Sequence, residues 1–224
     1  MSIQQTEVLQ IKLQASLDTL ISKIGKIQIG TKEQFPLGWR KAAKGRTVWR
    51  ILEEVITQNL EKYYSELGIT SITASDSEVT VYDFSTLFDG ELNQAYVNIK
   101  SAVLGGPSRK DDISKFDKLL KFYESFPGVK PDFFIGTFYI TFHDDMSFEI
   151  IKCVAFPIAW IQESDIGINT SNNGNVQLKK YKNIEDAEKK TPEEFYEILK
   201  KKVVEALSKK EAAALLKKQN KLNP

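Results

Sequence analysis

Two long stretches near the start of the chain carry apolar residues at helical spacing. Residues 6 to 27 form the first, and residues 47 to 67, which end before Gly68, form the second and more regular one. The apolar positions of the second stretch are Val48, Ile51, Leu52, Val55, Ile56, Leu60, Tyr63, Tyr64 and Leu67. Glu53 lies on the border of this stripe, because each residue of a helix advances by about 100°. We therefore expect a buried helix face with Glu53 able to turn inward.

Strand-like residues follow the second predicted helix. Residues 69 to 83 lead to turn chemistry at Asp89-Gly90, and residues 96 to 102 then alternate between polar and apolar. This arrangement predicts an antiparallel hairpin that brings the carboxylates of the first segment near the second strand. Side chains two apart share a face of a strand, so Asn98 and Lys100 are expected side by side. An edge strand with one polar row facing water is the simpler explanation of that pair.

The second half of the chain continues with helices and strands. Asp111-Asp112 is expected to open a helix, strands are expected over 133–142 and 148–156, and a last helix is announced by Thr191, Pro192 and Glu194, a capping box. The order helix, helix, strand, strand, helix, strand, strand predicts an α/β domain with a mixed central sheet flanked by helices. We expect residues 1–224 to form one domain.

Composition limits the functional classes. The chain has 224 residues, of which 42% are hydrophobic, and this is enough for a sizeable core. A single cysteine, Cys153, excludes an intrachain disulfide framework and a cysteine-based zinc cluster. The first residues lack the pattern of a signal peptide, and no apolar run approaches the ~18 residues of a membrane span. We therefore expect a cytoplasmic protein with no membrane partner.

The only histidine argues against hydrolases that activate a nucleophile with a His base. His143 is followed by Asp144 and Asp145, which is typical of a hairpin turn. A catalytic role for His143 is therefore not expected.

Charge is distributed unevenly, although the net charge is only +1. Residues 26 to 50 are strongly basic and include Arg46. From Lys179 onward thirteen lysines stand against eight acidic residues, and the middle of the chain is acidic. Basic ends suit a protein that holds a polyanion, because each cation brought to a phosphate releases counterions. Arg46, and Arg109 in a basic glycine-containing loop, are therefore candidate DNA contacts, although a solvated surface explains any single charge run equally well.

A turn-rich segment between residues 165 and 178 combines short amides and hydroxyls. Its candidate DNA-contacting residues, together with the lysine that follows, are Asn169, Thr170, Asn172, Asn173, Asn175 and Lys179. Asparagine pairs with adenine, a threonine methyl group packs on thymine, and lysine binds phosphate. The segment contains no Arg or Lys to read guanine, so an A·T-rich site is expected. An ordinary long hairpin loop would have the same composition.

The residues around Asn98 and Lys100 resemble a known nuclease family. An acidic residue at a strand, a hairpin, a strand ending in x-x-K and a glutamate-bearing helix before them are similar to the PD-(D/E)XK core of type II restriction endonucleases. Residue by residue, the resemblance assigns Asp76 as the first metal-binding acid, Asn98 as the second metal-binding position, Lys100 as the lysine and Glu53 as the helix glutamate. Asp83 competes with Asp76, and we prefer Asp76. Asn98 departs from the family pattern because it is neutral.

The segment around residues 165–182 is similar to the recognition loop of the EcoRV-like, blunt-cutting branch. The resemblance implies Mg²⁺ bound by Asp76, Asn98 and the carbonyl of Ile99, and a homodimer that cuts palindromic double-stranded DNA. It divides the chain into an N-terminal helix and basic arm (1–46), a catalytic core (47–160), a recognition region (161–190) and a C-terminal helix (191–224). Two alternatives remain: a repair or recombination nuclease on the same core, and a DNA-binding protein without catalysis.

Overall fold

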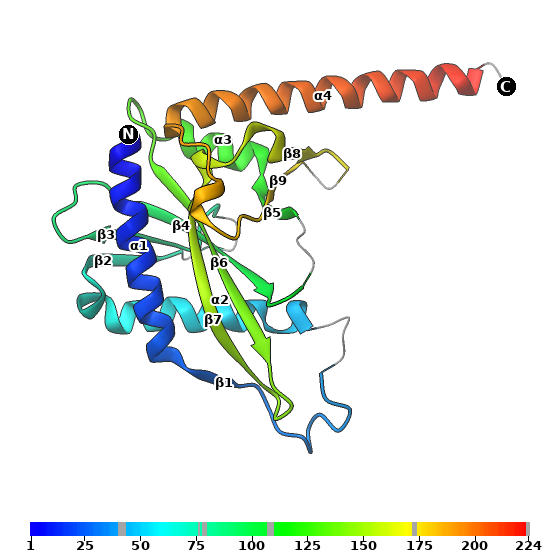
Figure 1. The fold of residues 1–224 in the computed structure, drawn as a ribbon. Coiled ribbons are helices and arrows are strands. Elements are labelled where there is room, and N and C mark those ends of the chain that lie inside the picture. Colours follow the sequence, from blue (N-terminus) through cyan, green and yellow to red (C-terminus); the bar gives the residue numbers. More distant parts are fainter. Residues whose placement is uncertain (40–43, 76, 78–79, 107–109, 172–173, 223–224) are drawn as a thin grey trace.

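A computed structural model describes residues 1–39, 44–75, 77, 80–106, 110–171 and 174–222, with backbone alone at 44–47, 186 and 216–222 (Figure 1). The helices are α1 (Ile3–Ile24), α2 (Lys44–Tyr63), α3 (Phe116–Glu124) and α4 (Pro192–Leu222). The strands are β1 (Lys26–Gln28), β2 (Ile69–Ala74), β3 (Phe84–Phe88), β4 (Ala95–Val103), β5 (Lys110–Lys115), β6 (Asp132–Phe142), β7 (Ser147–Pro157), β8 (Ile166–Asn169) and β9 (Asn175–Lys179). Short 3-10 turns cover Tyr64–Leu67, Ile158–Trp160, Glu163–Asp165 and Ile184–Asp186.

The strands form two sheets. The larger has the order β1-β7-β6-β4-β3-β2, with β4 and β6 parallel and the other described neighbours antiparallel. The smaller, which we call the hairpin sheet, has the order β5-β9-β8 and is antiparallel. The predicted α/β class with a mixed central sheet is confirmed.

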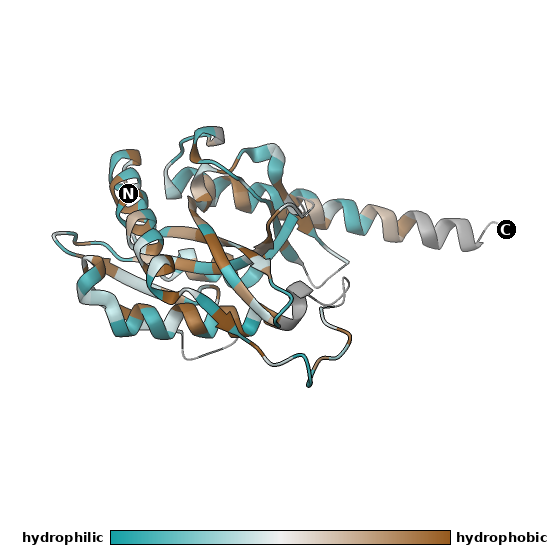
Figure 2. Cartoon of the chain, turned by 60° about the horizontal axis from the view of Figure 1, so that its bottom comes forward, coloured by the Kyte–Doolittle hydropathy of each residue, from teal (hydrophilic) through white to brown (hydrophobic). Residues whose placement is uncertain are grey.

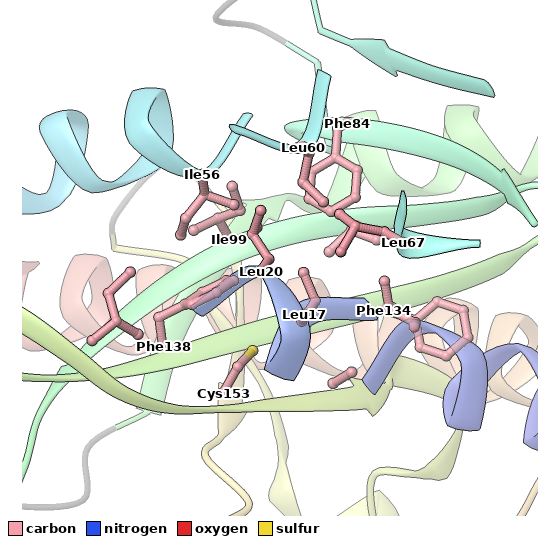
Figure 3. Close-up of a cluster of buried hydrophobic side chains, with 14 of the residues drawn as sticks. Leu17, Leu20, Ile56, Leu60, Leu67, Phe84, Ile99, Phe134, Phe138 and Cys153 are labelled. Carbon is pink, nitrogen blue, oxygen red and sulfur yellow. The ribbon is translucent and has the colours of Figure 1, made fainter. Parts of the chain in front are cut away.

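One face of the large sheet is covered by α1 and α2. Val97 and Ile99 of β4 are buried on this face, where they belong to a core shared with both helices. Figure 3 shows Ile99 in this core together with Leu17 of α1 and Ile56 of α2. Leu17 of α1 and Ile56 of α2 are fully buried in the same cluster. Side chains of a strand alternate between faces, so Asn98 and Lys100 lie on the opposite face.

The opposite face carries a second core. It joins the large sheet to the hairpin sheet, α3 and the first turns of α4, through residues such as Phe133, Leu178 and Phe195. The remainder of α4 projects from the body of the molecule (Figure 1). Hydrophobic and hydrophilic residues follow one another along the projecting helix (Figure 2). Because the second core contains residues of both sheets, the hairpin sheet packs against the face of the large sheet that carries Lys100.

Helices form at α2 and α4 as predicted, although Ile51 and Tyr64 of the predicted buried stripe are exposed and α2 passes into a 3-10 turn after Tyr63. The apolar stripe of α1 also differs from the simplest helical pattern. Val8 and Ile11 are exposed, and Leu9 and Leu13 are buried. The helix begins at Ile3, earlier than the pattern indicated, because Ser2 forms a capping box with Gln5. The predicted capping box at the start of α4 is present between Thr191 and Glu194.

Two assignments made from the sequence are wrong: one strand pairing and one helix start. The segment of β2 does not pair with β4, because β3 stands between them. Four of the five residues of β3 are buried, so the strand lacks the alternation that reveals a half-exposed strand. Asp111 and Asp112 do not open a helix; they lie in β5, and α3 begins at Phe116. Neither carboxylate caps a helix, because Asp111 pairs with Lys180 and Asp112 accepts from Gln177.

None of the helices, in the parts of the chain that the structure describes, combines the length and the apolarity needed to cross a membrane.

Candidate active site

Among the described residues, no strand pairs with the β3-facing edge of β4 beyond Val97, and we call this stretch the open edge. The pairing of β3 with β4 runs from Thr86 opposite Ala95 to Phe84 opposite Val97, whereas β6 accompanies β4 to its end. Asp83, the residue before β3, lies against the start of this open edge. Its amide donates to the carbonyl of Val97 at 2.8 Å, and its carboxylate accepts a short hydrogen bond from the amide of Ile99.

The carbonyl of Ile99 lies on the same open edge. In a strand the N–H and C=O groups of one residue point to the same neighbour. The amide of Ile99 points to Asp83, away from β6. A backbone oxygen is therefore presented beside the carboxylate of Asp83.

Asn98 is buried beneath this edge, with 6% of its surface exposed. Its Nδ2 donates to the carbonyl of Val81 at 3.0 Å, which fixes the orientation of the amide. Its Oδ1 is buried and has no hydrogen-bond partner among the described residues. A buried acceptor without a partner is costly, and this pattern is typical of a site that a ligand completes.

Glu53 and Lys100 approach from opposite faces of the sheet. Glu53 comes from α2, where its side chain is 19% exposed and lies 3.9 Å from the guanidinium of Arg50. Lys100 comes from the other face of β4, and its positive charge lowers the pKa of both Glu53 and Asp83. The open edge therefore gathers two carboxylates, an ammonium, a buried amide oxygen and a backbone carbonyl.

The pKa values of the two carboxyl groups reflect this crowding. Burial, and then the negative charge of Asp83, raise the pKa of Glu53 to about 7, against the lowering effects of Lys100 and Arg50. Burial raises the pKa of Asp83, although the amide of Ile99 and the charge of Lys100 lower it. Burial and the neighbouring negative charge both disfavour the ionised forms of these carboxyl groups. A cation bound beside them would stabilise the ionised forms.

The donor atoms fit a hard divalent cation. Asp83, Glu53, the Oδ1 atom of Asn98 and the carbonyl of Ile99 all offer oxygen, which Mg²⁺ prefers as a ligand. Among the described residues no group of three or more His, Cys, Asp or Glu side chains is close enough to hold a metal. The candidate set depends instead on two carboxylates and two neutral oxygens.

Of the residues expected at the site, Glu53 and Lys100 lie close enough to Asp83 for their charges to interact, and Ile99 donates its amide to Asp83. Asn98 directly precedes Ile99 in β4, and the roles expected for these residues stay predictions. Asp76 lies outside the described residues, and the structure brings Asp83 to the site. The signal for Asp83 was present in the sequence, because the Asp89-Gly90 turn sets it close to the row of Asn98.

Arg50 was not predicted for this site. It lies one turn before Glu53 on α2, stacks over Trp49 with 4.1 Å to the ring centre, and its charge lowers the pKa of both Glu53 and Asp83. The i, i+3 spacing of Arg50 and Glu53 was the available signal.

The expected DNA-contacting residues of the 165–179 segment lie on the hairpin sheet where they are described. Asn169 and Thr170 stand at the end of β8, and Asn175 and Lys179 at the two ends of β9. Asn169 accepts from the amide and hydroxyl of Ser171, which shapes the turn. Asn172, Asn173 and Arg109 lie outside the described residues, and Arg46 is described by its backbone alone, within α2.

The side chains of Asn175 and Lys179 also have partners. The Nδ2 of Asn175 donates to Asp112 at 3.1 Å, and the ammonium of Lys179 lies 3.2 Å from Asp165. Asp165 also accepts from the hydroxyl of Tyr181 at 2.6 Å. The side chain of Lys179 remains 53% exposed, so it is accessible from solution.

A comparison of the sequence with models of known protein families finds no match, and a comparison with curated proteins finds none either.

Proposed function

We propose that this chain is a Mg²⁺-dependent endonuclease of the restriction type, which hydrolyses double-stranded DNA at a palindromic, A·T-rich site. The observation that carries the proposal is the open edge of β4, where the carboxylate of Asp83 accepts from the amide of Ile99 and interacts with the charges of Glu53 and Lys100. Beside it, Oδ1 of Asn98 is buried without a hydrogen-bond partner among the described residues. Carboxylates beside a lysine on a rigid strand are suited to hydrolysis of a phosphodiester, because the strand holds each group in place.

The residues of the site have separable roles. Asp83, Asn98, Glu53 and the carbonyl of Ile99 would hold Mg²⁺. When bound, the metal polarises the scissile phosphate and lowers the pKa of a coordinated water. Lys100 would orient the attacking water and stabilise the negative charge that develops on the phosphate. Asp83 takes the place expected for Asp76, because Asp83 is hydrogen-bonded to the strand that carries Lys100.

The reaction adds one water across a P–O bond. The oxygen of the water forms a bond to phosphorus, the bond from phosphorus to the leaving oxygen breaks, and that oxygen gains a proton. Arg50, at the entrance of the site on α2, is 56% exposed and is suited to contact a DNA phosphate near the cut.

The hairpin sheet would read the bases. Its turn carries asparagine and threonine, which suit adenine and thymine, and Lys179 stands beside it for the backbone. A palindromic site implies a symmetric homodimer in which each protomer cuts one strand. The second candidate is a DNA-binding protein without catalysis, which the neutral Asn98 favours.

The experiment is an incubation of the purified protein with long DNA and Mg²⁺, with the cut ends mapped. Discrete fragments that share an A·T-rich palindrome are expected. Nicks at branched or damaged structures would indicate a repair nuclease, and a mobility shift without cutting would indicate a non-catalytic binder. A recognition sequence dominated by G·C pairs would show that the hairpin turn is not the reader.

A further inference from the structure

Lys180, the residue after β9, links the hairpin sheet to β4. Its Nζ lies 3.1 Å from Oδ1 of Asp111, the second residue of β5, and donates at 3.1 Å to the carbonyl of Ser101. Ser101 directly follows Lys100. One ammonium therefore joins a carboxylate of the hairpin sheet to the backbone of the strand that carries the candidate site.

The carbonyl of Ser101 belongs to the same open edge as that of Ile99. Backbone groups of a strand alternate between its two edges, so residues 97, 99 and 101 point to one edge and residues 98 and 100 to the other. Lys180 thus binds the open edge two residues beyond Ile99. A shift of this contact would move the backbone that positions Lys100 and the Ile99 carbonyl.

The Lys180–Asp111 pair is poorly explained by stability alone. The two side chains are only 14% and 20% exposed, and Oδ2 of Asp111 is buried with no hydrogen-bond partner among the described residues. Taking two charges out of water costs free energy that their attraction often fails to recover, and apolar residues of similar size are frequently as stable. A role in positioning β4 explains why a charged pair, Lys180 and Asp111, lies at this largely buried place.

Asp111 also faces Lys100. Burial raises the pKa of the Asp111 carboxyl, while the charges of Lys180 and of Lys100 lower it. Lys100 therefore interacts with carboxylates on both sides: Asp83 and Glu53 at the open edge, and Asp111 in the hairpin sheet. Movement of the hairpin sheet would change the electrostatic environment of Lys100 directly.

We propose that the Lys180–Asp111 pair is a positioning unit that couples the seating of the hairpin sheet on DNA to the placement of Lys100 and of the Ile99 carbonyl. This inference rests on the proposed nuclease function, since it assigns the hairpin sheet to the DNA bases and β4 to the cut. Lys180 and Asp111 are then positioning residues, which act through Lys100 and do not touch the scissile phosphate.

The test compares Lys180→Met with the double variant Asp111→Leu, Lys180→Met, which leaves no unpaired buried charge. Lys12→Met is the matched control, because Lys12 likewise bridges a carboxylate and a carbonyl, those of Glu91 and Asp89, elsewhere on the surface. For each protein one measures DNA affinity in Ca²⁺, the single-turnover cleavage rate in Mg²⁺, and deuterium exchange of residues 95–103 with and without DNA.

Both site variants are expected to bind DNA with nearly unchanged affinity and to cut it about 10- to 100-fold more slowly, as for a small misplacement of a catalytic group. DNA should slow exchange of residues 95–103 in the wild type and in Lys12→Met, but not in the two site variants. An unchanged cleavage rate, or equal protection of these residues in all four proteins, would overturn the coupling.

The two proposals fail differently. If the wild type cuts no DNA, the nuclease function is wrong, and the exchange measurement still decides whether the pair couples the two sheets. If the wild type cuts DNA and the variants cut equally fast, the nuclease function stands and the coupling is wrong.

Discussion

The carboxyl group of Glu53 is the proposed metal ligand with the most strongly raised pKa. Its pKa is raised to about 7 by burial and by Asp83, so a cation between the two carboxylates would relieve an unfavourable charge. Binding to the folded state at a hundred times Kd stabilises it by about 2.7 kcal/mol. For a chain of this size that corresponds to a rise in Tm of roughly 5–10 °C.

We therefore expect Mg²⁺ or Mn²⁺ to raise the Tm of the wild type, and to raise it less in Glu53→Gln, which lacks one charged ligand. Glu54→Gln is the matched control, because Glu54 is exposed on the next position of α2 and accepts a hydrogen bond from Gln58. Thermal unfolding with increasing cation concentration measures the effect. Equal shifts in Glu53→Gln and the wild type would exclude Glu53 as a ligand.

The buried carboxyl group of Asp132 makes the stability of the fold depend on pH. Asp132 is not one of the proposed metal ligands. Burial raises the pKa of its carboxyl to about 6, although Thr6 donates a hydrogen bond to it at 2.7 Å and the N-terminal ammonium also lowers it. Between pH ~4 and ~6 the Asp132 carboxyl group is therefore protonated in the folded state and ionised in the unfolded state. Stability is greatest below this window and falls as the pH rises through it.

Asp132→Asn should remove this cost. We expect the variant to be more stable than the wild type at pH 8 by about 2 kcal/mol, and the difference to shrink toward pH 4. Urea unfolding at several pH values measures it. Asp144→Asn, an exposed carboxylate in the turn between β6 and β7, should show no such trend, and a pH-independent difference for Asp132→Asn would contradict the assigned ionisation.

The proposed roles of the hairpin sheet place base reading at its turn and phosphate binding at its rim. Lys179 stands at its rim, paired with Asp165 but half exposed. Lys179→Ala should weaken binding to all DNA sequences alike and reduce the slope of log K against log salt by about 1. Lys189→Ala is the control, since Lys189 is similarly exposed and paired, with Glu7. A sequence-selective loss in Lys179→Ala would assign this lysine to base reading.

The elements that were predictable from sequence are those defined by local signals. The period of α2 and the capping box of Thr191 and Glu194 are local, and so is the shared face of Asn98 and Lys100. The failures are non-local: β3 is a short buried strand without alternation, and the role of Asp111 depends on Lys180, 69 positions along the chain. Sequence spacing cannot show such partners, because they are set by how the two sheets pack.

At the scale of the whole molecule, the proposed palindromic site requires two copies of the chain. On α4, Val204 and Leu215 are exposed, with 63% and 62% of their surfaces accessible. We expect a particle of twice the chain mass in light scattering after size-exclusion chromatography, and one dimer per duplex in the presence of DNA and Ca²⁺. A monomer that remains monomeric on DNA would contradict the symmetric cut.

The most direct test of the central claim is the cleavage of long DNA in Mg²⁺ by Lys100→Ala, with binding measured in Ca²⁺. Lys121→Ala, an exposed lysine on α3, is the control for loss of a positive charge. We expect Lys100→Ala to bind DNA nearly as well as the wild type without cutting it, and Lys121→Ala to bind and cut normally. Cleavage by Lys100→Ala at the wild-type rate would contradict the assignment of the site at the open edge of β4.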